Sequence, residues 1–485
     1  MSNQSVEIAG RSVRQPRRGN EGWSVERVLA ATGGRLVSGN RGVNFRLITT
    51  DSRAVNPGDL FLALSGETYH GADFAGQAVA AGAAGLILSS PPSSPATVPV
   101  ILVPDTLRAL GDLAGYHRRR MADLSVLAIT GSSGKTTVKE MTAAILTPGR
   151  KILATRGNLN NLIGVPLTLL GLETGHTIAV IEMGMNQPGE ITRLTEIADP
   201  DLACINNVQS AHLAGLGSIE GVARAKGELF QGVRPDACLV VNLDDSLVKR
   251  LGVACPQRRI TFGRHRRAEV RATRLFSHGP DGISFTLGIN GEHRRIRMGC
   301  IGTHNVNNAL AAAALAFGAG ATPDEIIRGL AAFVPYDKRL QVVRGIGGLR
   351  LINDTYNANP ASMLAALKTL AEVRRERRAL VILGDMLELG EASQEAHRVL
   401  GETVAHLGFD GLFSCGAFAR EMAKAARGGG LAVVKACGDK DEAVAAVRTM
   451  LRENFLAPGD WVLVKGSRGL KMETIINQLK EPGLV

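Results

Sequence analysis

Residues 130–137 read T-G-S-S-G-K-T-T and stand between two apolar segments of the chain. The segment before them, 124–129, is short and uninterrupted, which favours a buried strand. The segment after them, 138–146, has the length and pattern of a helix. A strand that ends in a glycine-containing turn and continues as a helix is the arrangement by which α/β proteins bind phosphate groups. This stretch therefore predicts the fold of the region around it.

The residue types in this loop suit a nucleoside triphosphate. Its two glycines allow backbone N–H groups to surround phosphate oxygens, a lysine supplies a cation, and a threonine hydroxyl can reach a magnesium ion. The residues expected to contact the nucleotide are Gly131, Ser132, Ser133, Gly134, Lys135, Thr136 and Thr137. The usual loop has a further glycine at the position of Ile129, so this shortened form does not by itself identify the class of protein.

Composition and length indicate a multidomain α/β enzyme. The 485 residues suggest about three domains of roughly 150 residues each. An apolar content of 45% with 57 glycines and only 4% aromatic residues is typical of Ala- and Gly-rich α/β proteins. No apolar run approaches the ~20 residues that span a bilayer, so we expect no transmembrane segment.

The net charge and the cysteines indicate which kinds of ligand and which cellular compartment to expect. The net charge of +11 comes from scattered positive residues, and few aromatic residues are present for base stacking, so we expect anionic small-molecule ligands and no nucleic acid. The six cysteines form no C-x-x-C pair and no metal-like spacing with histidine. They are therefore expected to be reduced, mostly buried thiols of a cytoplasmic protein.

The pattern along the chain divides it into four parts. Residues 1–22 resemble a basic disordered tail without the apolar core of a signal peptide. Residues 23–122 contain short strands and helices, with a helix over 25–32 that Ser24 can cap and a strand over 45–49. Residues 123–335 alternate strands and helices, which predicts a mostly parallel sheet with helices on both faces. Residues 336–485 restart this pattern as a second α/β sheet.

Polar residues follow the strands of the central part, where ligands bind in such sheets. Glu182 ends a strand predicted over 177–181, and Asn207 and His212 follow the next strand, 202–206. Glu182 is either a carboxylate exposed at a strand end or a ligand of magnesium, which prefers oxygen ligands. By itself His212 reads as an ordinary loop histidine. Lys226, in a helical segment at 221–230, reads by itself as a lysine whose stem lies along an apolar face.

Each of three polar stretches can have either a structural role or a binding role. Residues 157–161, G-N-L-N-N, form either a plain turn or a binding loop. Residues 302–308, G-T-H-N-V-N-N, precede an Ala-rich helix predicted over 309–317 and form either an elaborate N-cap or a site at which Asn305 contacts a base. Lys465, Ser467 and Arg468 follow a strand at 461–464 and form either a basic turn or a substrate contact.

Six motifs occur in an order and spacing that resemble the Mur ligase family, over nearly the whole chain after residue 23. They are T-G-S-S-G-K-T-T, G-N-L-N-N-L-I-G-V-P, E-M-G, A-K-G-E, G-T-H-N-V-N-N and D-T-Y-N-A-N-P. The resemblance implies three domains: a small α/β uridine-nucleotide-binding domain, a central ATPase-like domain with a phosphate loop, and a C-terminal Rossmann-like α/β domain. It also implies ATP and two Mg²⁺ ions.

Within the family, three features resemble the members that join D-alanyl-D-alanine to UDP-N-acetylmuramoyl-tripeptide. These features are the D-S-R of residues 51–53, D-T-Y-N-A-N-P in place of the D-D-Y-A-H-N-P of sister ligases, and L-G-D-M-L-E-L-G at 383–390. The resemblance implies this activity through an acyl phosphate, in a cytoplasmic monomer. The alternatives are a sister ligase that adds another amino acid and a phosphate-loop ATPase without ligase activity. No stretch indicates whether the tripeptide ends in meso-diaminopimelate or L-lysine.

The resemblance also assigns roles to individual residues. It implies that Lys226 is carbamylated and, with Glu182 and His212, holds the second metal ion, while Thr136 serves the first. Asn305 and Asp354 resemble the adenine and ribose contacts, and Arg339 resembles an arginine that reaches the phosphates. The residues that carry the reaction would be Lys135, Lys226, His212 and Arg339. Expected substrate contacts are Ser52, Arg53, Asn158, Asn160, Asn161, Asn357, Asn359, Lys465, Ser467 and Arg468.

Overall fold

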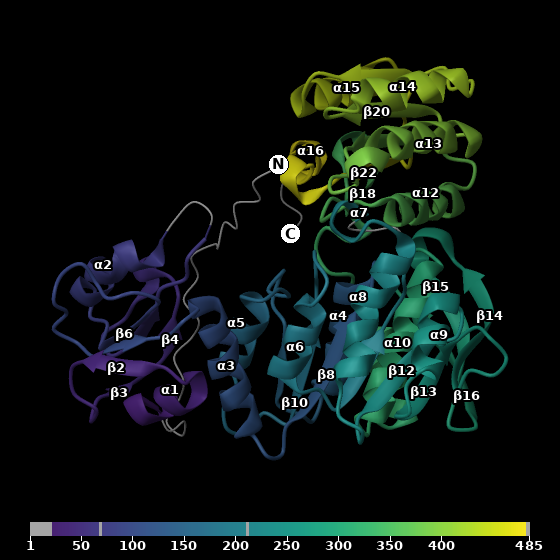
Figure 1. The fold of residues 1–485 in the computed structure, drawn as a ribbon. Helices are drawn as coiled ribbons and strands as arrows, with labels where there is room; N and C mark the ends of the chain where they lie inside the picture. Colours follow the sequence, from purple (N-terminus) through teal and green to yellow (C-terminus); the bar gives the residue numbers. More distant parts are fainter. Residues whose placement is uncertain (1–21, 67–69, 210–212, 482–485) are drawn as a thin grey trace.

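The computed structural model describes residues 22–66, 70–209 and 213–481, and within these ranges the strands form four sheets. A two-stranded and a five-stranded sheet belong to the first part of the chain, a nine-stranded sheet to the middle and a six-stranded sheet to the last part. Figure 1 shows the last part above one edge of the middle part, with the first part to one side. The molecule is mixed α/β with mostly parallel sheets, as the sequence predicts.

The first part is built on the sheet β2-β7-β6-β5-β4, in which only β2 runs antiparallel to its neighbour. The predicted helix over 25–32 is present, and the Ser24 side chain accepts a hydrogen bond from Arg27 N at 3.2 Å. The elements are β1 (Trp23–Ser24), α1 (Val25–Thr32), β2 (Arg35–Ser38), β3 (Asn44–Phe45), β4 (Ile48–Thr49), η1 (Ser52–Ala54), β5 (Leu60–Leu62), η2 (Gly71–Phe74), α2 (Ala75–Ala80), β6 (Gly85–Leu88), β7 (Val100–Leu102) and α3 (Thr106–Arg119).

The single strand predicted over 45–49 is wrong, because this segment belongs to two sheets. β3 pairs with β1, whereas β4 pairs with β5 in the larger sheet. The chain passes from one sheet to the other between β3 and β4, where Arg46 N donates a hydrogen bond to Gly58 O at 2.8 Å. Apolar pattern alone does not reveal which partner a strand of two residues will have.

The middle part contains the sheet β16-β15-β14-β13-β12-β11-β8-β10-β9. Its strands from β9 to β14 are parallel, and the central ones are buried on both faces. The elements are β8 (Ser125–Thr130), α4 (Lys135–Leu146), β9 (Ile152–Ala154), α5 (Gly164–Leu170), β10 (Ile178–Glu182), α6 (Glu190–Ala198), β11 (Leu202–Ile205), α7 (Leu213–Leu216), α8 (Ile219–Gly232), β12 (Cys238–Asn242), α9 (Ser246–Val253), β13 (Arg258–Gly263), β14 (Val270–Ser277), η3 (Gly279–Asp281), β15 (Ile283–Ile289), β16 (Glu292–Met298), α10 (His304–Gly318) and α11 (Pro323–Ala332).

An antiparallel extension of this sheet, β14 to β16, is absent from the sequence-based prediction. β15 and β16 form a hairpin whose two-residue turn is Asn290-Gly291, and both residues have positive φ, 51° and 76°. Asn-Gly is the residue pair that such a turn favours, because its backbone twist matches that of the strands. The signal was therefore present in the sequence.

Two apolar layers enclose the central sheet. On one face α4, α10 and α11 pack against the strands, and on the other face α5, α6, α8 and α9 do so. The Ala-rich helix α10 is almost entirely buried, because its small side chains allow close approach to the sheet and to α4. This packing fixes the carboxyl edge of the sheet, where the parallel strands end.

The last part contains the sheet β17-β18-β22-β19-β20-β21, parallel except for β17. Helices α12 to α14 cover one face, and α15 and α16 cover the other. The elements are β17 (Gln341–Arg344), η4 (Ile346–Gly348), β18 (Arg350–Asp354), α12 (Pro360–Arg374), β19 (Ala379–Gly384), η5 (Gly390–Ala392), α13 (Ser393–His406), β20 (Gly411–Cys415), α14 (Ala419–Gly428), β21 (Val434–Cys437), α15 (Lys440–Arg452), β22 (Trp461–Lys465), η6 (Arg468–Leu470) and α16 (Glu473–Leu479).

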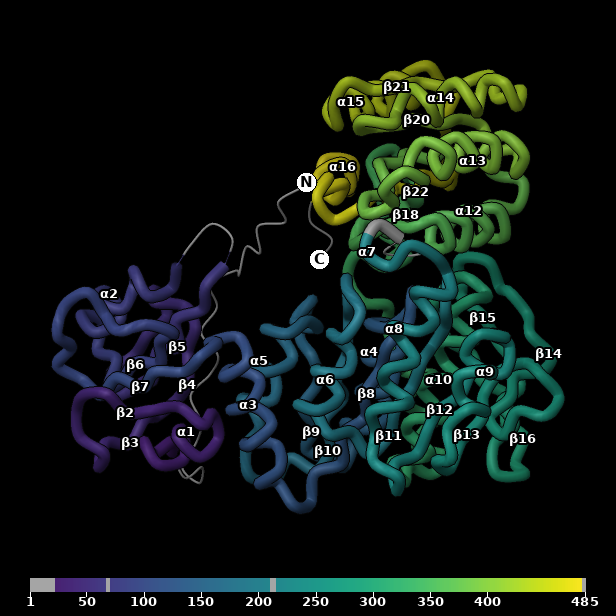
Figure 2. The backbone as a smooth tube through the Cα atoms, viewed as in Figure 1, coloured from purple at the N-terminus to yellow at the C-terminus, as the bar shows by residue number. Residues whose placement is uncertain are grey.

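Helix α3 connects the first part to the middle part. It packs against α1 on one side and against α5 and α6 on the other, and Figure 2 shows α3 and α5 between the five-stranded sheet and the rest of the molecule. Near the end of α3, Arg118 donates hydrogen bonds to the carbonyl oxygens of Ala198, at 2.9 Å, and Asp199, at 2.8 Å. These contacts hold α3 at the amino edge of the central sheet, where the strands begin.

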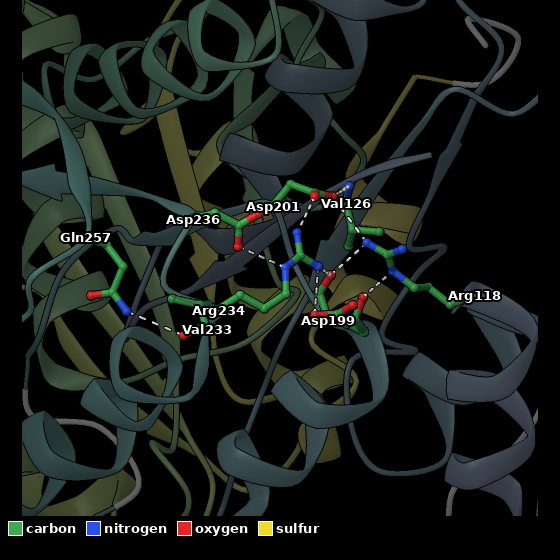
Figure 3. Close-up of polar contacts among 9 residues, drawn as sticks. Arg118, Val126, Asp199, Asp201, Val233, Arg234, Asp236 and Gln257 are labelled. Carbon is green, nitrogen blue, oxygen red and sulfur yellow. Dashed lines mark hydrogen bonds and ion pairs between the residues drawn. The ribbon is translucent and has the colours of Figure 1, made fainter. Parts of the chain in front are cut away.

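A cluster of five charged residues, here the amino-edge cluster, surrounds this contact (Figure 3). Arg234 forms ion pairs with Asp199 at 2.8 Å, Asp201 at 2.7 Å and Asp236 at 3.2 Å, and Arg118 lies 3.2 Å from Asp201. Asp201 also accepts a hydrogen bond from Val126 N, near the start of β8. The cluster is formed by Arg118, Asp199, Asp201, Arg234 and Asp236, and it ties α3, α6 and β8 together.

Two further sequence-based expectations concern membranes and cysteines. Among the helices of the described residues, none is both long and apolar enough to cross a bilayer. All six cysteines are free thiols, and only Cys238 is partly exposed. The prediction of reduced, mostly buried thiols is thus confirmed.

Candidate nucleotide and ligase site

The phosphate loop lies at the carboxyl edge of the central sheet, between the end of β8 and the start of α4. Gly134 is the N-cap of α4 with φ 77°, and a Cβ atom there would lie 2.3 Å from Asn308 Oδ1. Only glycine fits this conformation and this space. The loop can therefore approach the first turn of α4, whose N–H groups face outward as an anion site.

Asparagines from neighbouring elements hold the loop in place. Asn206 Nδ2, just after β11, donates to Ser133 O at 3.0 Å and to Asn308 Oδ1 at 3.0 Å. Asn207 Oδ1 accepts from Ser133 N at 2.9 Å. The sequence predicts that Asn207 projects at this edge, but not that three asparagines together shape the loop, because their pairing depends on α10 packing beside β11.

Glu182 and Thr136 form the centre of the site. Thr136 Oγ1 donates to Glu182 Oε2 at 2.7 Å, and Asn160 Nδ2 donates to Glu182 Oε1 at 2.8 Å. Glu182 is only 2% exposed, at the last position of β10. The carboxylate therefore does not face bulk solvent, and both of its oxygens lie beside polar groups of two other elements.

Two lysines of this region are strongly buried. Lys135 Nζ donates to Gly131 O at 2.8 Å, while burial lowers its pKa against the opposing charge of Glu182. Lys226, on α8, is 1% exposed, and burial followed by the charge of Lys135 lowers its pKa well below the ordinary lysine value. Burial thus disfavours the charged form of the Lys226 amine. Lys226 is not one of the cleft-lining residues.

Arg339 approaches the same centre from the segment between the middle and last parts. Its Nη2 donates to Thr136 Oγ1 at 2.8 Å, and its Cζ lies 3.8 Å from the centre of the Tyr356 ring. Its Nε is buried and has no hydrogen-bond partner in the structure. The contact with Tyr356 is absent from the sequence-based prediction, and no spacing in the chain indicates it.

Asp354 is the last residue of β18, in the last part of the chain, and Asn305 lies in α10, in the middle part. Asp354 Oδ2 forms an ion pair with Lys465 Nζ at 2.6 Å, and Asp354 Oδ1 accepts from Leu340 N at 3.1 Å. Asn305 Nδ2 donates to Ile301 O at 2.8 Å, and its Oδ1 accepts from Asn308. Thr303 of the motif at 302–308 is the N-cap of α10, without a side-chain cap hydrogen bond, and the helix begins at His304, five residues before the predicted start. Asn305 therefore lies within the first turn of the helix.

The predicted substrate residues of the last part lie around the loop after β18. The buried amine of Lys465 donates to Asn357 O at 2.8 Å, and Ser467 Oγ accepts from Leu387 N at 2.9 Å. Asn359 caps α12 by accepting a hydrogen bond from Ser362 N. Arg468 is exposed, with 58% of its side chain accessible.

A cleft of about 970 Å³ joins these groups. It is lined by the phosphate loop from Ser132 to Thr137 and by most of the predicted residues, namely Asn158, Asn160, Asn161, Glu182, Asn305, Arg339, Asp354, Asn357, Asn359, Lys465, Ser467 and Arg468. Ser52 and Arg53 lie in η1 of the first part, outside this lining, where Arg53 pairs with Asp51 at 2.9 Å. His212 lies outside the described residues.

The side chains at the centre suit a hard metal ion such as Mg²⁺. Thr136 and Glu182 offer oxygen atoms, the ligand type that Mg²⁺ prefers. Within the described ranges, no group of three or more His, Cys, Asp and Glu side chains is arranged to hold a metal. Two protein oxygens agree with a magnesium ion that shares its remaining positions between water and substrate phosphates.

Three family models match the chain. They are the Mur ligase middle domain over residues 129–316, the Mur ligase glutamate ligase domain over 338–468 and the Mur ligase family catalytic domain over 44–118. The UDP-N-acetylmuramoyl-tripeptide--D-alanyl-D-alanine ligase of Escherichia coli strain K12 is 39% identical over 440 residues, which are 90% of this chain and 94% of the relative.

Two solved structures extend this similarity to the fold. MurF from Acinetobacter baumannii superposes with a TM-score of 0.86 at 34% identity, covering 94% of this chain and 98% of the other. MurF ligase from Thermotoga maritima, solved in complex with ADP, superposes with a TM-score of 0.79 at 26% identity, covering 89% of this chain and 96% of the other. The similarity thus extends over the first, middle and last parts of the chain.

Proposed function

The chain belongs to the Mur ligase family, and from that premise we propose that it joins D-alanyl-D-alanine to UDP-N-acetylmuramoyl-tripeptide at the expense of ATP. The relative of E. coli carries this activity in its name, and the similarity extends over 90% of the chain. The observation that carries the proposal is the cleft, in which two cationic side chains, Lys135 and Arg339, approach one buried carboxylate, Glu182.

The reaction needs ATP because a carboxylate is a poor electrophile. In the first step, an oxygen of the tripeptide carboxylate attacks the γ-phosphorus of ATP, the bond to the β,γ-bridging oxygen breaks, and ADP leaves with that electron pair. Lys135 and Arg339 offset the repulsion between the two anions and stabilise charge on the transferred phosphoryl group. The product is an acyl phosphate.

In the second step, the amine of D-alanyl-D-alanine attacks the acyl carbon. The tetrahedral intermediate loses a proton from nitrogen and expels phosphate, which leaves the new amide bond. Neither step needs a nucleophile from the protein. Positioning of the three reactants can supply up to ~7–11 kcal/mol of the barrier reduction, so we propose that the last part closes over the middle part during the cycle.

We assign magnesium to the oxygens of Thr136 and Glu182, and a second ion to Glu182, His212 and a carbamate on Lys226. A buried amine with a lowered pKa supports the carbamate, because the unprotonated nitrogen of Lys226 can attack CO₂ and lose a proton, which replaces a basic amine with an anionic oxygen ligand. Bound magnesium would supply charge neutralisation on the phosphate oxygens. Gly131 and the rest of the phosphate loop would bind those oxygens through backbone N–H groups.

The remaining roles follow the division of the chain into four parts. We propose a basic tail at 1–22, a UDP-muramyl-peptide-binding domain at 23–122 with Ser52 and Arg53 as contacts, an ATP-binding domain at 123–335 and a ligase domain at 336–485. Asn305 and Asp354 would face the adenine and ribose, and Asn158, Asn160 and Asn161 the muramyl peptide. The loop residues Asn357, Asn359, Lys465, Ser467 and Arg468 would face the dipeptide or the phosphate. We propose a cytoplasmic monomer, since the substrates are nucleotide-linked small molecules.

A coupled assay of ADP release tests the function. Release should require both UDP-N-acetylmuramoyl-tripeptide and D-alanyl-D-alanine, and paired tripeptides ending in meso-diaminopimelate or L-lysine would identify the third residue. Release that requires neither substrate would indicate an ATPase without ligase activity. Release that depends on free diaminopimelate or glutamate would indicate a sister ligase.

A further inference from the structure

The loop after β18 contacts three successive residues of the segment that carries Arg339. Tyr356 N donates to Lys338 O at 3.2 Å, the Tyr356 ring stacks on Arg339, and Asp354 Oδ1 accepts from Leu340 N at 3.1 Å. The loop belongs to the last part of the chain, whereas the same guanidinium also touches Thr136 of the phosphate loop in the middle part. Arg339 is therefore held between the two parts that the proposed reaction brings together.

From this geometry we propose that Tyr356 is a positioning residue that holds the Arg339 guanidinium above the phosphate loop. The proposal rests on the proposed function and adds a residue to it. A planar guanidinium 3.8 Å from the centre of an aromatic ring is attracted by the negative face of that ring. The ring also limits how far the guanidinium can rotate, while its buried Nε–H keeps no partner in the structure and can bind an anion.

The backbone on both sides of Arg339 indicates that its position is imposed by these contacts. Lys338 and Leu340 have φ angles of 63° and 49°, in the left-handed region that L side chains rarely adopt. Such a conformation persists only where surrounding contacts enforce it. Here the contacts include Tyr356 N to Lys338 O and Leu340 N to Asp354, together with the ion pair of Lys338 with Glu473, so the segment from Asp354 to Tyr356 contributes to the position of Arg339.

The hydrogen bonding of Arg339 is incomplete in a way that fits a phosphate ligand. In the described structure its Nη2 donates to the neutral hydroxyl of Thr136, its guanidinium also reaches the Tyr356 hydroxyl, and its buried Nε has no partner. An arginine that served only to fasten two domains would be expected to meet a carboxylate, as Arg234 does three times at the amino edge. Tyr356 therefore holds an arginine whose donors remain available to the transferred phosphoryl group.

This role predicts an effect on kcat with little effect on the KM for ATP. Charge on the phosphoryl group develops during transfer, so a misplaced Arg339 weakens the transition state more than the bound substrate. Tyr356→Leu should lower kcat for ADP release about 3- to 30-fold, the range of one cation–π contact, and change the KM for ATP less than about threefold. Tyr356→Phe keeps the ring and should restore most of kcat.

A double-mutant cycle separates positioning from a merely structural role. In an Arg339→Ala background, Tyr356→Leu should cause no further loss, because the group that the ring positions is already absent. Tyr356→Gln, a second variant without the ring, should reproduce the Leu result. Tyr116→Leu is the matched control, since Tyr116 lies on α3 with Arg120 Cζ 5.8 Å from its ring and outside the cleft lining, and it should leave kcat unchanged.

The proposal is overturned if both ring-deleting variants retain wild-type kcat, or if their loss adds in full to that of Arg339→Ala. Melting temperatures within a few degrees of wild type will show that the variants are folded, as expected for a residue that is only half-buried. If wild-type ADP release ignores both peptide substrates, the proposed ligase function fails, yet the same cycle on that ATP turnover still tests Tyr356. The two failures are therefore distinguishable.

Discussion

The two edges of the central sheet hold basic side chains in opposite electrostatic states. At the amino edge, two arginines, Arg118 and Arg234, meet the three aspartates of the cluster. At the carboxyl edge, Lys135 Nζ donates to the carbonyl oxygen of Gly131, Arg339 Nη2 donates to the hydroxyl of Thr136, and the buried Lys226 feels the charge of Lys135. The arginines of the first edge thus meet carboxylates directly, whereas Lys135 and Arg339 at the second edge donate to neutral oxygens, although carboxylates such as Glu182 also line the cleft.

The pKa shifts express the same difference. Burial lowers the pKa of Arg234, but its hydrogen bonds to Asp201 and Asp199 outweigh burial and raise it. For the more deeply buried Arg118, burial prevails and lowers the pKa, although a guanidinium remains charged at neutral pH. Burial and the charge of Lys135 lower the pKa of Lys226 well below its ordinary value. Ion pairs within the amino-edge cluster stabilise the fold, whereas cations that donate to neutral oxygens remain able to bind an anionic ligand.

The largest effect is expected at the phosphate loop. Lys135→Ala should reduce ADP release by about 10³-fold or more, since it removes a cation from the transferred phosphoryl group. The coupled assay measures this loss, with Lys249→Ala on the exposed side of α9 as a control that should leave the rate unchanged. Normal turnover by Lys135→Ala would exclude the loop from the mechanism.

A second effect concerns the proposed carbamate. Lys226→Ala should reduce the rate about 100-fold, and acetate or formate should partly restore it by replacing the lost carboxylate-like group. Rates measured with and without added short carboxylates test this. Lys226→Arg should remain inactive, because a guanidinium does not form a stable carbamate, and full activity of that variant would rule out the modification.

At the amino edge the expected loss is in stability and not in rate. Arg118→Met should lower the free energy of unfolding by about 3 kcal/mol, because it leaves carbonyl and carboxylate oxygens without their partner, and should change kcat less than about threefold. Urea titration with parallel kinetics tests this. Arg108→Met, on the same helix but 76% exposed, should cost no more than ~0.5 kcal/mol. If Arg118→Met lost much of its kcat while its free energy of unfolding stayed unchanged, the predicted difference between the two edges would be wrong.

The smallest expected effect is a gain in stability. Lys226→Met should raise the free energy of unfolding by about 1 kcal/mol at pH 7 in CO₂-free buffer, since the lowered pKa means that the unfolded lysine binds its proton more tightly than the buried amine does. The gain should shrink as pH rises toward the ordinary lysine value of 10.5, where both states are neutral. Urea titrations at pH 7 and pH 10 measure it, and a less stable variant at pH 7 would contradict the depressed pKa.

The sequence predicted the elements that depend on local pattern. The strand and helix around the phosphate loop, the Ser24 cap and the position of Glu182 at a strand end all follow from residue order. The antiparallel hairpin was missed although its Asn290-Gly291 turn was readable. The division of 45–49 between two sheets was not readable, because strand partners lie far apart in the chain.

For the site, the sequence by itself determined which chemical groups are present, because glycines, hydroxyls and cations in a fixed local order can bind phosphate before any tertiary contact forms. Only the tertiary structure decided their electrostatic state. Burial lowers the pKa of Lys226, and folding places the Tyr356 ring against Arg339, which also touches Thr136, 220 residues earlier in the chain than Tyr356. These properties depend on what surrounds a residue in space, which the order of residues alone does not specify.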